Sequence, residues 1–171
     1  HELNVRREGF LLFFVSVTHI QEFAERVAND TALLQLMVAL QAIANAPVVL
    51  GGDVARQGDD ATVIARRQGR QCFDLRTLRI PDTMLIAQQF IDEQTKQQAD
   101  AFFVDETGGY GAGVIDAMRQ RNHEVIGVHF SGKASDYRYF NKRSEMYFEM
   151  AKWVKAGGAL PPDRELKEEL C

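Results

Sequence analysis

Two aspartates, far apart in the sequence, stand where buried strands are predicted to end. Asp53 follows the apolar run 48–52, and Asp105 follows the apolar run 101–104. A carboxylate in or beside a buried strand loses hydration, and a nearby cation is needed to compensate for that loss. Two such carboxylates repel each other when they are brought together, and a hard divalent cation such as Mg²⁺ or Mn²⁺ relieves the repulsion. The pair therefore predicts an oxygen-ligand metal site, provided that the fold joins the two strand ends.

Both aspartates also fit a purely structural role. Asp53 can cap the turn after its strand, and Asp105 can cap the helix that begins near Gly111. Aspartate side chains accept hydrogen bonds from backbone N–H groups in both settings. Spacing alone favours neither interpretation, so both stay open at this point.

A glycine-rich segment, Asp105–Gly113, leads directly into a predicted helix. Backbone N–H groups at such a place can bind a phosphate, although glycines there serve equally well for close packing of a strand against a helix. The segment lacks the GxxxxGK[ST] pattern and the lysine of a P-loop. Since no such motif occurs in the chain, we predict no P-loop ATPase site of its own.

Basic residues gather at three places outside these strands. They are Arg66, Arg67 and Arg70 around one predicted hairpin, Lys133 and Arg138 in the loop after the last predicted strand, and Lys142 with Arg143 at the next helix start. Such residues can follow a phosphate backbone, or they can form an ordinary solvated face. The histidines lack metal-ligand spacing, and His129 with Ser131 forms no catalytic triad.

The composition is that of one globular domain. The chain has 171 residues, of which 46% are hydrophobic and 26% charged. The longest apolar run, residues 10–17, is far shorter than the ~20 residues of a membrane-spanning helix, so we expect no contact with a membrane. With 20 Lys and Arg against 24 Asp and Glu, the net charge of −4 excludes DNA binding by bulk electrostatics alone. Any DNA contact must be local or metal-assisted.

Cysteines and targeting signals add two further expectations. Cys72 and Cys171 are the two cysteines, and one of them ends the chain. Their number and places argue against a disulfide framework or a thiolate metal site. The opening residues carry no cleavable signal pattern, so we expect an intracellular protein.

Residues 1–46 are interpreted as a helical N-terminal arm. A helix is predicted over 20–27 and a longer one over 31–44, which Pro47 stops. The apolar residues of the longer helix recur every three or four positions, at Leu33, Leu36, Met37, Leu40 and Ile43. We expect this helix to pack on a neighbouring domain or subunit rather than to bind a cofactor.

Residues 47–171 are interpreted as the main domain. Three strands joined by short turns come first, over 48–54, 61–67 and 71–79, with a turn at 56–60, and predict an antiparallel meander. The segments that follow are a helix over 82–97, a strand over 101–104, a helix over 111–121, a strand over 124–130, and helices over 141–155 and 163–170.

A meander followed by alternating helices and strands is typical of the ribonuclease H-like fold. We therefore predict an α/β domain with a ribonuclease H-like mixed sheet and flanking helices, in which strands separated by one helix run parallel. In that fold the first and fourth strands lie side by side at the centre of the sheet. Asp53 and Asp105 would then face each other from adjacent strand ends.

Four stretches of the chain resemble, in order and spacing, the C-terminal nuclease domain of the large terminase subunit of tailed bacteriophages and prophages. They are VVLGGDVARQGDDATVI, FFVDETGGYGAGVIDAM, VIGVHFSGKASD and YFNKRSEMYFEMAKWVKAGGALPPDRELKEEL, which together cover about Val48 to Leu170. The resemblance implies a two-metal endonuclease that cuts concatemeric double-stranded viral DNA at the start and end of packaging. It implies two Mg²⁺ or Mn²⁺ ions as cofactors and Asp53 and Asp105 as the catalytic metal ligands.

The resemblance also implies what accompanies such a domain. Large terminases are two-part motors with an N-terminal packaging ATPase, and residues 1–46 resemble the linker or tail of that part. The implied partners are double-stranded DNA, the packaging ATPase domain, the portal and the small terminase subunit, in the cytoplasm of a bacterial host. Among the basic residues, the candidate DNA contacts are Arg66, Arg67, Lys133, Lys142 and Arg143.

The family's third metal-binding aspartate lies near its C-terminal end, and we expect that position to fall beyond Cys171. The local substitutes are Asp163, Glu145 and Asp136, of which Asp163 fits better as the cap of a helix after two prolines. The resemblance therefore predicts a truncated domain with weak or absent activity.

Two other functions compete with the nuclease. An actin-like or sugar-kinase-type ATPase fragment would use GGDVARQGDD as a phosphate loop, but such enzymes need two domains around the nucleotide, which 171 residues do not supply. A non-catalytic docking module for the portal or the small subunit would use the apolar N-terminal helix as its contact.

Overall fold

The computed structural model describes residue 25 and residues 30–55, 61–107 and 109–170. The predicted helix over 20–27, apart from helical Glu25, and the predicted turn at 56–60 lie outside the described residues. The chain divides into two units, residues 1–42 and 43–171. Within the described part of the chain, no helix is long and apolar enough to cross a membrane.

The first long helix, α2 (Thr31–Ala44), has the bounds that its periodicity predicted. Asp30 begins it, since its Oδ1 accepts the N–H groups of Ala32 at 2.9 Å and Leu33 at 3.2 Å. No side chain of α2 is buried, and its large apolar residues are exposed. The apolar pattern of α2 is therefore solvent-exposed in the part of the chain that the structure describes.

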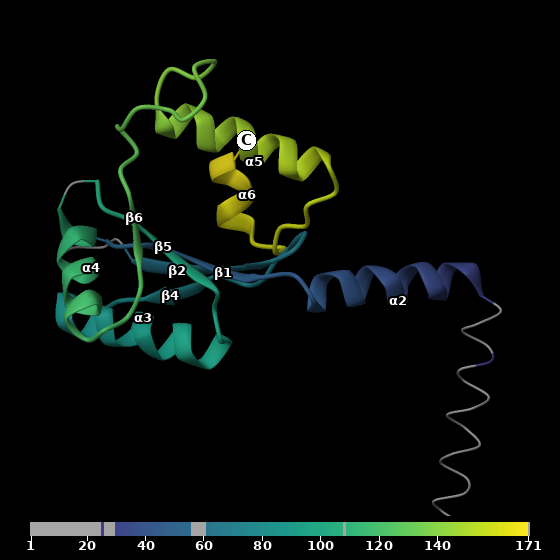
Figure 1. The fold of residues 1–171 in the computed structure, drawn as a ribbon, viewed down its shortest axis with the longest axis horizontal. Helices are drawn as coiled ribbons and strands as arrows, with labels where there is room; N and C mark the ends of the chain where they lie inside the picture. Colours follow the sequence, from purple (N-terminus) through teal and green to yellow (C-terminus); the bar gives the residue numbers. More distant parts are fainter. Residues whose placement is uncertain (1–24, 26–29, 56–60, 108, 171) are drawn as a thin grey trace, which may run out of the picture. The chain divides into compact units, whose positions relative to one another are not determined.

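The unit 43–171 is built on one mixed sheet. Its strands are β1 (Val48–Asp53), β2 (Thr62–Gln68), β3 (Gln71–Cys72), β4 (Arg76–Leu78), β5 (Ala101–Asp105) and β6 (Ile126–Val128). They lie in the order β3-β2-β1-β5-β6, with β4 also paired to β2. β1 is antiparallel to β2 and parallel to β5, and β5 is parallel to β6. This arrangement confirms the predicted ribonuclease H-like topology (Figure 1).

The third predicted strand, 71–79, is divided into β3 and β4. Arg67 is paired with Cys72 and Ile64 with Arg76, so residues 73–75 lie opposite only residues 65–66. The extra residue forms a bulge. At this bulge the N–H of Phe73 donates to the carbonyl of Arg66 at 2.9 Å. The Arg66 guanidinium carbon lies 4.1 Å from the centre of the Phe73 ring. Apolar alternation does not reveal such an insertion, because the residues on both sides of it keep their β-type composition.

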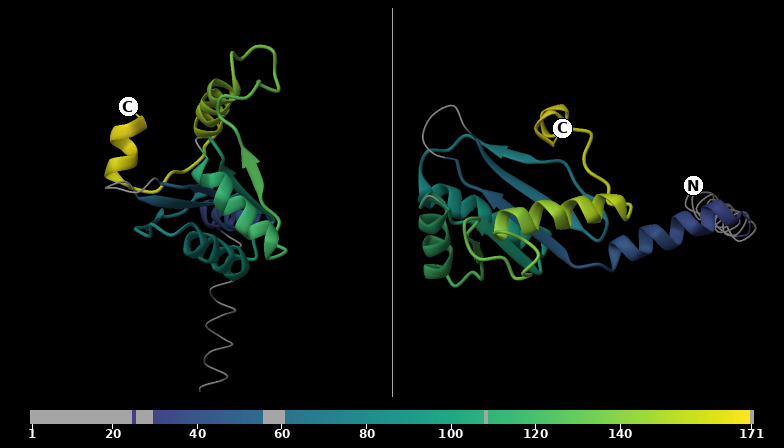
Figure 2. Two further views of the ribbon diagram at one scale, coloured as in Figure 1. Left: turned by 90° about the vertical axis from the view of Figure 1, so that its left-hand side faces the viewer. Right: turned by 90° about the horizontal axis from the view of Figure 1, so that it is seen from above.

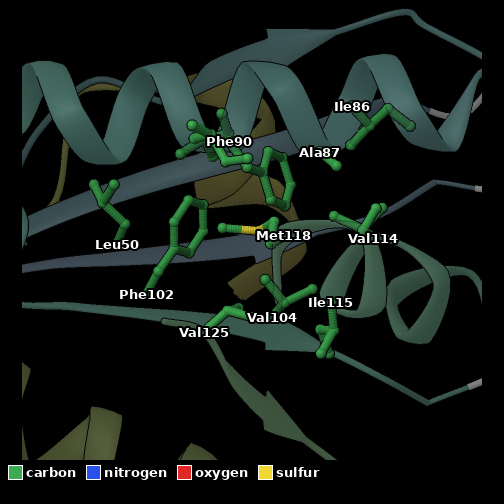
Figure 3. Packing of buried hydrophobic residues seen from close by; sticks show 13 residues of the cluster. Leu50, Ile86, Ala87, Phe90, Phe102, Val104, Val114, Ile115, Met118 and Val125 are labelled. Atoms are coloured by element: carbon green, nitrogen blue, oxygen red, sulfur yellow. The ribbon is translucent and has the colours of Figure 1, made fainter. Parts of the chain in front are cut away.

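Helices α3 (Thr83–Gln97) and α4 (Tyr110–Gln120) cover one face of the sheet (Figure 1). Asp82 caps α3 by accepting the N–H groups of Met84 and Leu85. The rings of Phe90 and Phe102 stack with their centroids 4.9 Å apart. Figure 3 shows the core between helices and sheet, whose largest members are Leu50, Ile86, Phe90, Phe102, Val104, Val114, Ile115 and Met118. The apolar residues of both helices thus face the sheet.

Helix α5 (Lys142–Lys155) lies over the opposite face of the sheet (Figure 2). Asn141 begins it with a capping box, in which its side chain accepts the N–H of Ser144 while the Ser144 hydroxyl bonds back to Asn141. The chain then returns to the sheet edge. There the N–H of Cys72 donates to the carbonyl of Ala159 at 2.8 Å, before α6 (Arg164–Leu170) closes the described residues.

Candidate functional site

Asp53 and Asp105 lie at the carboxyl ends of β1 and β5, two adjacent parallel strands. Gly52 is paired with Val104, so the residues that follow them, Asp53 and Asp105, are neighbours in register. Val104 is buried against the helices, and alternation along a strand therefore places both aspartates on the opposite sheet face. The predicted meeting of the two strand ends is confirmed, while the role of the two residues as metal ligands stays a prediction.

Two glycines set the backbone under these aspartates. A Cβ on Gly52 would lie 2.5 Å from a ring carbon of Phe90, so only glycine lets α3 pack against the end of β1. A Cβ on Gly111 would lie 1.7 Å from the carbonyl oxygen of Asp105, so the first turn of α4 rests directly on the end of β5. The glycines thus serve close packing, which was one of the two interpretations open for Gly111.

The two aspartates share a pocket of about 240 Å³. Its other lining residues come from four strands, from the segment after β6 and from α5, and all of them are apolar: Gly51, Gly52, Val63, Ala65, Phe103, Val104, Val128, Phe130 and Met146. The carboxylates are therefore the charged groups of this wall.

A larger hollow of about 660 Å³ lies between the segment 160–162 and the start of α6. It is lined by Asp163 but by neither Asp53 nor Asp105. We place the candidate site in the smaller pocket because it brings together two carboxylates from separate strands.

The two aspartates are less buried than their places beside apolar strands predicted. Asp53 is exposed and Asp105 is half-buried, so Asp53 retains its hydration. Repulsion is the remaining reason for a cation, since two negative charges at adjacent register positions repel each other and a divalent ion between them relieves that repulsion. The attraction for a divalent ion therefore follows from the pairing of the residues and not from their burial.

Asp105 does not cap α4, and that expectation is wrong. Its Oδ1 accepts the N–H of Thr107 at 2.8 Å, whereas the N-cap of α4 is Gly109, which makes no side-chain hydrogen bond and has a φ of 93°. The Thr107 Oγ1 in turn accepts the N–H of Phe130 at 2.9 Å. This chain of bonds fixes one oxygen of Asp105. Its Oδ2 has no hydrogen-bond partner among the described residues.

Thr107 and Phe130 were not identified from the sequence. The spacing of Asp105 and Thr107, two residues apart at a strand end, is the signature of an Asx turn and could have indicated the first of them. Nothing in the sequence around Phe130 distinguishes it from an ordinary strand residue.

The described residues place no third carboxylate at the pocket. They contain no group of three or more His, Cys, Asp or Glu side chains that could hold a metal ion. Asp163 accepts the N–H of Leu166 at 2.9 Å and so acts as the predicted helix cap.

The other two candidates for a third ligand, Asp136 and Glu145, form ion pairs beside α5. Hydrogen bonds from Arg138 lower the pKa of Asp136 to about 2. The hydrogen bond from Lys142, at 2.5 Å, holds the pKa of Glu145 below its ordinary value. Both carboxylates are therefore charged at neutral pH, and each is already paired with a cation.

The carboxylate oxygens at the pocket are of the kind that Mg²⁺ prefers as ligands. Both carboxylates come from rigid strand ends, and Mg²⁺ is commonly held by one or two carboxylates with water completing its shell. Asp53 and Asp105 are the residues that would hold it.

The predicted DNA contacts divide between the two sheet faces. Ile64 is buried against the helices, so alternation along β2 places Arg66 on the helix face and Arg67 on the face of the aspartates. Arg66 is held there by Gln68, whose Oε1 accepts from its guanidinium at 2.9 Å. Of this pair, only Arg67 shares the face of the pocket.

The remaining candidates follow β6. Arg143 is exposed, and its guanidinium carbon lies 5.7 Å from the centre of the Phe130 ring, which lines the pocket. Lys142 is bound to Glu145, and Lys133 is exposed. Arg143 is therefore the predicted contact whose link to the pocket the structure describes most directly.

Comparisons with known proteins identify the fold. The nuclease domain of the large terminase subunit gp2 of bacterial virus Sf6 is similar to this chain with a TM-score of 0.53 at 21% identity, over 61% of this chain and 52% of that domain. A point variant of that domain with manganese and beta-thujaplicinol gives a TM-score of 0.50 at 22% identity, over 61% and 52% of the two chains. A variant with calcium gives 0.51 at 20% identity, over 63% and 54%.

The similarity reaches only part of those domains, since this chain spans about half of their length. No protein-family profile matches the sequence, and no curated protein matches it. The comparisons thus confirm the predicted resemblance at the level of the fold.

Proposed function

We propose that this chain is a metal-dependent DNA endonuclease domain of a viral DNA-packaging terminase, which cuts concatemeric double-stranded DNA in a bacterial host. One observation carries the proposal: the topology brings Asp53 and Asp105, from strands separated in sequence by three strands and a helix, to adjacent ends in one pocket. The shared fold with a phage terminase nuclease domain supports it.

The residues of the pocket divide the work between binding and orientation. Asp53 and Asp105 would hold divalent ions, Mg²⁺ or Mn²⁺ and two in number, which activate water and stabilise the leaving oxygen of a phosphodiester when bound. The Thr107 N–H orients the Asp105 carboxylate by holding its Oδ1. Phe103 and Phe130 form part of the apolar lining beside the two carboxylates.

The DNA contacts in this proposal come from cations on the pocket face. Arg143 beside Phe130 and Arg67 on β2 are suited to bind phosphates on either side of the cut. The packaging ATPase, the portal and the small terminase subunit are the proposed partners of the whole protein.

Plasmid nicking tests the proposal. Supercoiled DNA is incubated with the purified chain and Mn²⁺, Mg²⁺ or EDTA, beside the variants Asp53→Asn, Asp105→Asn and Asp116→Asn. The last is the matched control, since Asp116 is exposed on α4, on the other side of the sheet. We expect metal-dependent nicking that falls about 100-fold or more in the first two variants and is unchanged in the control.

Calorimetric titration with Mn²⁺ separates a missing metal site from a slow reaction. Weaker Mn²⁺ binding in Asp53→Asn and Asp105→Asn, but not in Asp116→Asn, would assign the ligands even if nicking is slow. Equal nicking by all four proteins would refute the proposed site.

A docking module is the second candidate function, favoured by the uncovered apolar residues of α2. It predicts concentration-dependent association of the purified chain together with no nicking under any metal. Substitution of Leu36 and Leu40 by Ser would then abolish association.

A further inference from the structure

The loop between β6 and α5, residues 131–141, presents two aromatic rings to solvent. Tyr137 is 96% exposed and Phe140 is 95% exposed. Rings that are so exposed to solvent contribute almost nothing to the stability of the core, since apolar area stabilises a fold only when it is buried away from water. Their presence on what we call the aromatic loop therefore points to a ligand.

The aromatic loop is tied at its base to the carboxylate pocket. The N–H of Arg143 donates to the carbonyl of Phe130 at 3.0 Å, and the N–H of Lys142 donates to the carbonyl of Gly132 at 2.8 Å. Phe130 itself lines the pocket with the two aspartates. A molecule bound in the pocket thus contacts Phe130, at the base of this loop.

Helix α5 braces the middle of the aromatic loop. The Glu145 carboxylate accepts the N–H groups of Ser135 at 3.1 Å and Asp136 at 3.2 Å. Tyr139, which lies between the two exposed rings in sequence, stacks on Phe148 with the ring centroids 5.6 Å apart. These contacts hold the backbone of the aromatic loop on both sides of Tyr137, which lowers the backbone entropy lost when a ligand stacks on the rings.

The charge around the rings is positive, although the whole chain carries −4. Residues 131–143 contain the four basic residues Lys133, Arg138, Lys142 and Arg143 and one acidic residue, Asp136. Arg138 and Lys142 are used within the protein, in ion pairs with Asp136 and Glu145. Lys133 and Arg143 form no ion pair among the residues that the structure describes.

We propose that the aromatic loop stacks on unpaired bases of the DNA strand that enters the pocket. Aromatic rings interleaved with cations bind single strands, because every base offers a flat π-face and every phosphate a negative charge. The centre of a protein-binding surface is instead depleted of charge, whereas here unpaired cations flank the rings. This inference rests on the proposed function, since it takes the DNA of the nuclease as the ligand.

Binding measured without cleavage tests it. In EDTA, fluorescence anisotropy measures the affinity of the chain for a labelled single strand of about 20 nucleotides and for the same sequence as a duplex. This length exceeds one single-strand binding site of ~4–16 nucleotides. In the doubly substituted Tyr137→Leu, Phe140→Leu variant, we expect single-strand affinity to fall about 5-fold or more. Duplex affinity should change less, because its bases are already stacked.

Three variants control the comparison. Leucine keeps apolar area but removes the π-face, so a loss in the double variant assigns stacking rather than apolar contact. The exchange Tyr137→Phe, Phe140→Tyr keeps both rings and should keep the affinity. Leu85→Ala removes an exposed apolar side chain on α3, across the sheet, and should bind as the unsubstituted chain does. Because the rings are almost fully exposed, thermal unfolding midpoints should be equal in all of them.

The outcomes separate this inference from the proposed nuclease. Nicking that needs Asp53, with single-strand binding unchanged in the leucine variant, would refute stacking and leave the nuclease standing. Single-strand binding that needs the two rings and persists in Asp53→Asn, without any nicking by the unsubstituted chain, would support stacking and refute the nuclease. Self-association that is lost in the leucine variant, with no effect on DNA, would show a protein-docking loop and overturn the inference.

Discussion

Substitution of Gly111 by alanine is expected to destabilise the domain and displace the candidate site. The added Cβ would lie 1.7 Å from the Asp105 carbonyl oxygen and 2.8 Å from its carbonyl carbon. Both atoms belong to the backbone of β5, so no side-chain rotation relieves the overlap. Either α4 must lift from the sheet or the end of β5 must move by more than 1 Å, on the order of the overlap itself.

The magnitude follows from comparison with Gly113, two residues further along α4. Its Cβ would lie 3.2 Å from the Thr83 Cγ2, a methyl group that can give way. Both substitutions gain about 1 kcal/mol of helix propensity, while overpacking costs roughly 1–3 kcal/mol or more. We therefore expect Gly113→Ala to leave the free energy of unfolding unchanged or to raise it. The free energy of unfolding of Gly111→Ala should be about 2–3 kcal/mol lower than that of Gly113→Ala.

Urea unfolding followed by circular dichroism measures this difference, and plasmid nicking reports the site. Since Asp105 moves with the strand end, Gly111→Ala should also lose metal-dependent nicking at temperatures where it remains folded. Equal free energies of unfolding for the two alanine variants would refute the close packing of α4 on β5.

Two further perturbations test the fold that supports the site. Phe90→Ala removes the ring that stacks on Phe102 and packs beneath Gly52. In a urea titration, this variant should lower the free energy of unfolding by about 3–5 kcal/mol. A loss below ~1 kcal/mol would contradict the packing of this core. Arg76→Ala removes the 2.5 Å ion pair with Glu93, a residue only 7% exposed. Burial raises the pKa of Glu93, but hydrogen bonds from Gln97 and Arg76, with the Arg76 charge, outweigh it and hold the pKa below its ordinary 4.5. A depressed carboxyl pKa stabilises the fold above 4.5, and the contribution is lost as the pH falls through the folded-state pKa. The free energy of unfolding of Arg76→Ala should therefore be about 1–2 kcal/mol lower at pH 7, a modest loss because Arg76 is itself partly solvated. This difference should shrink toward pH 3. A difference that does not depend on pH would exclude the ion pair as its cause.

Much of the domain follows from local patterns in the sequence. The bounds of α2 and the inward faces of α3 and α4 were predictable because their apolar residues recur with the helical period. The caps Asp82 and Asp163 stand one residue before their helices and follow prolines, which is a strong local signal. The pairing of β1 with β5 was predictable only through the topology that the element order suggested.

What the sequence did not predict depends on contacts between distant residues. The bulge that divides β3 from β4 inserts a single residue and leaves the composition of the strand unchanged. The hydrogen bond that turns Asp105 toward Thr107 competes with helix capping, and the outcome depends on where α4 begins. The exposure of Asp53 follows from its place at the very end of β1, on the face opposite α3 and α4.

The divided edge of the sheet also affects how the protein behaves at high concentration. A long, flat outer strand exposes a row of unpaired N–H and C=O groups, on which a second chain can build an intermolecular sheet. Here β3 has two residues and β4 has three, a bulge twists the edge between them, and Ala159 occupies hydrogen-bonding positions beside β3. At the other edge β6 has only three residues. Neither edge offers a template long enough for strand addition, so the fold resists aggregation through its sheet even where the central strands are highly apolar.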